Sequence, residues 1–310
     1  MSKQLFLILI LCGAVLQSCN TYRCSFGKTY DKIELQNTKK LRRLDLSNQN
    51  LKEAPSMISK ITDLRMLNLS GNTFLDIEKA LEVVPNPEKL QILILDSLAL
   101  KTIPKSVLRF KNLEHLSLNY NPEINIEEAI EYVLPLPLEF LNIQHNNLVT
   151  LPPNITNLTT LTGINLSNNQ ISNPETLQFL GKLPRLQSLW LTHNDLGDLP
   201  EEIGELKSLR FLYLEYNNLS SLPNSVENLE KVNVLHIGHN KFESLPIQII
   251  KMPRLLLLHV NNCEIIEIPE DFATRKYSLK SIIVDNNNLS EEHKKQWSKE
   301  FHSFFIASFE

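Results

Sequence analysis

An eleven-residue pattern of apolar and polar positions, L-x-x-L-x-L-x-x-N-x-L, recurs eleven times along this chain. The clearest copies read LTGINLSNNQI from Leu161, LQSLWLTHNDL from Leu186 and LRFLYLEYNNL from Leu209. Consecutive copies begin 23 to 26 residues apart. A fixed period in the twenties indicates stacked structural repeats, each too small to bury a core alone. The copies begin at Leu41, Leu64, Leu90, Leu113, Leu138, Leu161, Leu186, Leu209, Val232, Leu255 and Leu279.

The first half of each copy predicts a short strand, because apolar positions four and six alternate with variable positions three, five and seven. One strand per copy would stack into a parallel sheet. Position nine carries an asparagine whose amide can donate to and accept from the backbone of neighbouring turns. Because Leu98 replaces this asparagine in the third copy, we expect the turn at 96–100 to be the least well held. The asparagines are Asn72, Asn121, Asn146, Asn169, Asn194, Asn217, Asn240 and Asn287.

The second half of each copy returns the chain in one of two ways. Long copies predict short helices over 77–84, 126–134 and 175–180. Short copies contain an apolar residue followed by proline, which fixes φ and suits an extended or single-turn arc. These prolines are Pro55, Pro104, Pro152, Pro200, Pro223, Pro246 and Pro269.

The carboxyl terminus predicts a capping helix after the last repeat. Ser290 and two following glutamates have the composition of a helix start. The aromatic residues that follow have helical spacing, and we expect them to cover the open end of the eleventh repeat. They are Trp297, Phe301, Phe304 and Phe305.

On these motifs the chain resembles a bacterial leucine-rich-repeat protein of the L-x-x-L-P-x-x-I type, over about four fifths of its length. The resemblance implies an α/β solenoid of horseshoe shape. It implies a parallel sheet on the concave face, with short helices and extended arcs on the convex face. It also implies an interaction scaffold whose concave face is the usual contact surface, with no enzymatic activity or ligand common to the family.

The first 18 residues predict a signal peptide, because Lys3 precedes a twelve-residue apolar core that is too short to span a bilayer. Leu16-Gln17-Ser18-Cys19 resembles a lipobox, so we expect Cys19 to be lipidated in the bacterial cell envelope. Gln17 departs from the small residue usual there, and ordinary secretion is the alternative. We expect the lipid tether and amino cap over 19–40, the repeats over 41–289 and the carboxyl cap over 290–310.

Composition and motifs exclude several functions. Charge is nearly balanced, with 31 basic and 35 acidic residues, so nothing indicates nucleic-acid binding. The chain has only 8 glycines and no G-x-S-x-G, H-E-x-x-H or P-loop motif. We therefore expect a monomeric protein without catalytic residues, cofactor or metal. Cys263 stands at position nine of its copy, where we expect a buried, inert thiol.

Aromatic and histidine side chains gather at positions three, five, seven and eight, which would face the concavity or its rim. Six of the eight histidines fall there. Exposed aromatic residues supply large contact areas in interfaces, so we predict a ligand-binding surface. The alternative is sideways packing between strands without any ligand. The predicted surface comprises Trp190, Phe211, Tyr213, Tyr216, His193, His236, His239 and His259, flanked by Leu257.

His236 and His259 would lie on adjacent strands. No cysteine or paired carboxylate completes a zinc set, and a pH-responsive interface is the more plausible role for the pair. The leading hypothesis is therefore a lipid-anchored envelope protein that binds a protein or peptide in its concavity. A glycan-binding protein and a structural spacer or assembly protein are the alternatives.

Overall fold

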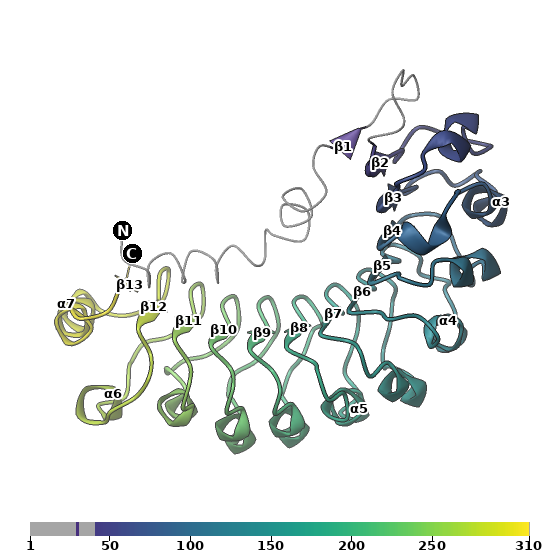
Figure 1. Cartoon of the computed structure of the whole chain (residues 1–310). Coiled ribbons are helices and arrows are strands. Elements are labelled where there is room, and N and C mark those ends of the chain that lie inside the picture. Colours follow the sequence, from purple (N-terminus) through teal and green to yellow (C-terminus); the bar gives the residue numbers. More distant parts are fainter. Residues whose placement is uncertain (1–28, 31–40, 310) are drawn as a thin grey trace. The chain divides into compact units, whose positions relative to one another are not determined.

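The computed structural model describes residues 29–30 and 41–309 (Figure 1). The predicted signal peptide, the lipidation of Cys19 and most of the predicted amino cap lie outside the described residues. The chain divides into two compact units, Met1–Asn146 and Asn147–Glu310. Each unit has its own strands, return segments and core.

The repeat predicted from the sequence is confirmed, since every copy supplies one three-residue strand at its positions three to five. The first unit contains β2 Arg43–Asp45, β3 Met66–Asn68, β4 Ile92–Ile94, β5 His115–Ser117 and β6 Phe140–Asn142. The second contains β7 Gly163–Asn165, β8 Ser188–Trp190, β9 Phe211–Tyr213, β10 Val234–His236, β11 Leu257–His259 and β12 Ser281–Ile283.

Strands pair in parallel and in chain order within each unit, and equal positions of successive copies lie opposite each other. In the first unit β1 (Thr29–Tyr30) adds an edge strand beside β2. In the second unit Trp190 pairs with Tyr213, Tyr213 with His236, and His236 with His259. Because the register repeats, each sequence position becomes a row of side chains across the strands.

The return segments lie on the side of each unit opposite its strands (Figure 1). The three predicted helices are confirmed as α3 Ile77–Glu82, α4 Ile126–Val133 and α5 Glu175–Gly181. Most of the proline steps begin a single 3₁₀ turn, with the proline at the N-cap. These turns are η2 Ser56–Lys60, η4 Lys105–Arg109, η5 Pro153–Asn157, η6 Glu201–Glu205, η7 Asn224–Asn228 and η8 Ile247–Lys251, while η3 Pro87–Lys89 follows α3 and α6 Asp271–Thr274 follows Pro269.

The core of each unit lies between its strands and its return segments. Positions one, four and six of the copies are buried, as Leu209, Leu212 and Leu214 illustrate in the eighth copy. The buried apolar side chains stack from one copy to the next, and this continuous core stabilises copies that could not fold alone.

The asparagines of position nine link neighbouring copies through their buried amides. The Oδ1 of Asn217 accepts from the backbone N–H groups of Asn194 and Leu196, at 3.0 and 3.1 Å. Its Nδ2 donates to the carbonyl oxygens of Leu191 and Leu214, at 3.0 and 2.8 Å. One side chain therefore satisfies backbone groups of its own copy and of the preceding one.

The expectation of a weak turn at 96–100 was wrong. The backbone N–H groups of Leu98 and Leu100 donate to Oδ1 of Asn121, at 3.1 and 3.0 Å. Each asparagine serves the turn of the preceding copy, so Leu98 instead removes an acceptor from the turn that follows Asn72. Phe74, in that turn, is 76% exposed.

The carboxyl end combines the predicted helix with a strand. Helix α7 spans Glu291–Glu300, and the Ser290 side chain at its N-cap accepts from the N–H of His293 at 3.2 Å. Trp297 and Phe301 are fully buried. The helix ends before Phe304, and the chain continues into β13 Ile306–Ser308, which pairs with β12. This strand was not predicted from the sequence.

Candidate functional site

Four aromatic side chains at position five form a continuous row on β8 to β11, called here the aromatic row: Trp190, Tyr213, His236 and His259. Trp190 and Tyr213 stack with ring centroids 5.2 Å apart. Tyr213 meets His236 edge-on at 4.9 Å, and His236 stacks on His259 at 4.0 Å. The structure therefore brings together the four residues that the repeat period placed in one column.

A second row, called here the turn row, consists of His193, Tyr216 and His239 at position eight. Their rings stack at 4.2 and 3.9 Å. All three have φ near +55°, a left-handed conformation that bulky side chains rarely adopt. Stacking between the rings offsets part of that cost. Tyr216 remains 45% exposed, so the row presents aromatic surface to solvent.

Position three adds apolar surface beside the aromatic row. Phe211 is half-buried and lies opposite Val234, while Val234 lies opposite Leu257. Both Val234 and Leu257 are buried. All eight residues predicted for ligand binding therefore lie on the strands β8 to β11 or in the turns that follow them.

Glu215, which was not among the residues predicted from the sequence, forms hydrogen bonds with the aromatic row and with the turn after β8. Its Oε1 lies 2.8 Å from Nδ1 of His236, and its Oε2 accepts from Oγ1 of Thr192 at 3.2 Å. Burial acts to raise the pKa of Glu215, but the hydrogen bond and charge of His236 outweigh it and the pKa is lowered. Glu215 is therefore ionised at neutral pH. A glutamate at position seven, one strand before a histidine at position five, is the signal that could have found this pair.

The ionised carboxylate fixes which nitrogen of His236 carries a proton in the neutral ring. A carboxylate only accepts, so Nδ1 must donate and Nε2 is left as an acceptor. Burial, together with the neighbouring His236, lowers the pKa of His259 to about 4, although Glu215 and Asp285 act in the opposite direction. His259 is therefore neutral at pH 7. Its Nε2 and that of His236 are buried, and neither has a hydrogen-bond partner among the described residues.

Burial also lowers the pKa of His239, helped by His193 and opposed by Glu215. Among residues 29–30 and 41–309, no group of three or more histidine, cysteine, aspartate or glutamate side chains could hold a metal ion. Cys263 is buried, and burial raises the pKa of its thiol, so it has the environment of an inert cysteine.

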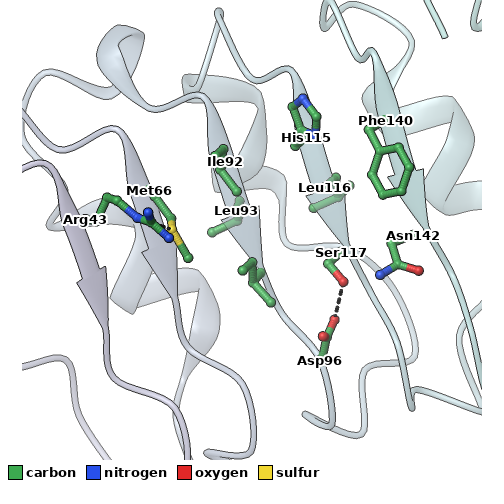
Figure 2. Close-up of a pocket in the computed structure, with 11 residues that line it drawn as sticks. Arg43, Met66, Ile92, Leu93, Asp96, His115, Leu116, Ser117, Phe140 and Asn142 are labelled. Carbon is green, nitrogen blue, oxygen red and sulfur yellow. Dashed lines mark hydrogen bonds between the residues drawn. The ribbon is translucent and has the colours of Figure 1, made fainter. Parts of the chain in front are cut away.

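The first unit contains a cavity of about 170 Å³ over the strands β2 to β6, which was not predicted from the sequence either (Figure 2). Arg43, only 4% exposed, donates from Nε to Sδ of Met66 at 3.3 Å. Ile92 and Ile94 line the cavity between Arg43 and Phe140, which stacks on His115 at 5.6 Å. Burial lowers the pKa of His115 to about 4.

The edge of this cavity at the carboxyl ends of the strands is polar. Asp96 accepts from Oγ of Ser117 at 2.7 Å and from the N–H of Asn119 at 2.8 Å (Figure 2). Burial raises the pKa of Asp96. Pockets that enclose a drug-sized ligand measure about 300–1,000 Å³, so this cavity suits a group no larger than a side chain. None of the predicted ligand-binding residues lines it.

Comparisons with known proteins agree with the repeat architecture. A family model described as a leucine-rich repeat region matches residues 164–252 and 199–284, and a leucine-rich repeat model matches 137–158. No curated protein matches the chain. The fold is therefore that of a leucine-rich-repeat protein.

Solved structures give the same fold. A TLR13–ssRNA13 complex matches with a TM-score of 0.69 at 22% identity, covering 87% of this chain and 43% of that one. This chain thus spans less than half of that longer protein. An internalin from Listeria monocytogenes matches with a TM-score of 0.51 at 21% identity, covering 90% of this chain and 71% of that one. A Leptospira interrogans leucine-rich-repeat protein is 22% identical over 90% of this chain and 99% of its own, with a TM-score of 0.40.

In the part of the chain that the structure describes, no helix is long and apolar enough to cross a membrane.

Proposed function

We propose that this leucine-rich-repeat protein is a non-enzymatic interaction module that binds a protein or peptide over the strands β8 to β11. Leucine-rich-repeat domains are typically protein-interaction modules. The observation that carries the proposal is the pairing of the aromatic row with the exposed turn row on one face. Exposed aromatic side chains such as Tyr216 supply the anchoring contacts of protein interfaces, and the buried ring of Tyr213 supports the half-buried Trp190 beside it.

The ring geometry favours a protein over a glycan. A sugar would stack on the open face of an aromatic ring, yet Tyr213 has Trp190 on one side and His236 on the other. Tyr216 is likewise enclosed between His193 and His239. Tyr213 is only 2% exposed, whereas Tyr216 is 45% exposed with both faces covered and so turns its edge toward solvent. Such an edge suits the irregular surface of a protein partner.

We further propose that the protein is anchored to the bacterial cell envelope through a lipid on Cys19. The support is the Leu16-Gln17-Ser18-Cys19 sequence directly after an apolar segment. Mass spectrometry of the mature amino terminus should find acylated Cys19. A Cys19→Ala variant should move the protein from the membrane fraction to the soluble one. A mature chain with unmodified Cys19 would support ordinary secretion instead.

The binding proposal is tested by capturing the partner with the intact protein and with a Trp190→Ala/Tyr213→Ala variant. After chemical crosslinking in cells, at least one protein should copurify with the wild type and be lost with the variant. Phe74→Ala is the matched control, because Phe74 is an exposed aromatic residue of the first unit. It should retain the partner.

Capture that is equal for the wild type and both variants would contradict a binding role for the aromatic row. It would favour the spacer or assembly function, in which replacing these rings leaves the phenotype intact. Binding on a glycan array, abolished by the double substitution while no protein is captured, would favour the glycan alternative.

A further inference from the structure

The fixed charges around the aromatic row are all negative. At positions three, five, seven and eight of the copies from Leu186 to Asn287, the only charged residues besides histidines are Glu215 and Asp285. No lysine or arginine occupies these positions. Interfaces place groups of opposite charge against each other, so a partner should present positive charge here.

The His236–His259 pair adds two buried imidazole nitrogens that have no hydrogen-bond partner among the described residues. His236 is only 9% exposed, and its Nδ1 is held by Glu215 at 2.8 Å. In the neutral ring its Nε2 is an acceptor, and the ring of His259 lies alongside at 4.0 Å with a second buried Nε2. Buried acceptors are usually satisfied by a donor, so a ligand that supplies an N–H group gains a hydrogen bond to His236.

Apolar side chains also flank the two imidazoles. Leu257 is buried beside them, and Ile283 lies opposite His259 on β12. A ligand group that fits must therefore combine an apolar stem with a positively charged tip that donates hydrogen bonds. Arginine and lysine side chains have this construction, with a hydrocarbon stem and several donors at the end.

We propose that His236, His259 and Glu215 together receive an arginine or lysine side chain of the protein partner. The proposal rests on the proposed function, since it names the chemistry of the partner at that surface. Nε2 of the neutral His236 ring accepts from the basic group, the His259 ring packs beside it, and the Glu215 carboxylate, bonded to the other nitrogen of His236, balances its charge. An acidic or phosphorylated segment would meet like charge at Glu215 and Asp285. A purely apolar segment would leave Nε2 of His236 without a donor.

The test uses random heptapeptides displayed on phage and selected on the full chain. Selected peptides should be enriched in arginine or lysine and should fail to bind Trp190→Ala/Tyr213→Ala. Glu215→Gln keeps the size of the side chain and removes its charge. It should weaken the best peptide about tenfold or more, and replacing that peptide's arginine by the neutral citrulline should do the same.

The matched control is Glu264→Gln, which removes one negative charge from an exposed position outside the surface. It should change the affinity less than about twofold, because screened surface charges contribute little. Circular dichroism of each variant checks that the solenoid is intact.

The outcomes separate the two proposals. Peptides that need Trp190 and Tyr213 but carry no basic residue, or that bind Glu215→Gln as well as the wild type, overturn the basic-side-chain inference and leave the interaction module standing. If no selected peptide depends on Trp190 and Tyr213, both proposals are overturned.

Discussion

At the scale of single residues, the asparagines of position nine stabilise the solenoid by serving two copies at once. The Asn217 amide accepts from two backbone N–H groups of the preceding copy and donates to carbonyl oxygens in both copies. It is also buried. A buried backbone group that loses its partner pays the cost of desolvation, so removal of one such amide affects several groups together.

We therefore expect Asn217→Ala to lower the free energy of unfolding by about 3 kcal/mol, because it leaves buried donors and acceptors in two turns without hydrogen-bond partners. Urea denaturation followed by circular dichroism measures the change. Asn288→Ala is the control, since Asn288 is exposed at the neighbouring position of its copy. It should change stability by less than about 0.5 kcal/mol. A loss of similar size in both variants would show that the asparagine at position nine has no special role in stability.

The repeat pattern identifies this row of amides but not the direction in which it acts. Counting along one copy suggests that Leu98 weakens its own turn, whereas the hydrogen bonds run to the preceding copy. Glu215 was missed for a related reason. Its contact with His236 joins different positions on neighbouring strands, and a comparison of equal positions does not find it.

At the scale of secondary structure, the strands and return segments followed from local signals. The alternation of apolar and variable positions located each strand. The prolines, which lie at the N-caps, located most of the 3₁₀ turns. Strand β13 had no such signal, because Ile306–Ser308 is short and lies outside the repeat. Its pairing with β12 depends on where α7 ends, which is a matter of packing.

We expect Trp297→Ala to loosen the carboxyl end. Trp297 is the buried side chain of α7, and truncating a buried tryptophan removes about 3–5 kcal/mol of packing. Because the loss is local, hydrogen exchange should accelerate at the backbone amides of β12 and β13 while those of β8 stay protected. Lys295→Ala, at an exposed position of the same helix, should leave exchange unchanged. Protection of β12 and β13 in Trp297→Ala equal to that of the wild type would contradict a capping role.

At the scale of the whole molecule, the repeat makes its surfaces predictable as rows. The aromatic row and the turn row were both found by reading equal positions across the copies, and the structure stacks them as continuous ring contacts. The cavity of the first unit was not found. It depends on the side-chain directions of Arg43, Met66 and Phe140, which the repeat pattern leaves open.

The central claim is that the strand face of β8 to β11 binds a protein. Its most direct measurement is the affinity of the captured and purified partner for the wild type, Trp190→Ala/Tyr213→Ala and Phe74→Ala, determined by titration calorimetry. An anchoring aromatic residue contributes about 2–4 kcal/mol, and the double variant removes half-buried Trp190 together with the buried Tyr213 ring that supports it, so it should bind at least about 30-fold more weakly. Phe74→Ala should match the wild type. Equal affinity of the partner for all three proteins would contradict the claim.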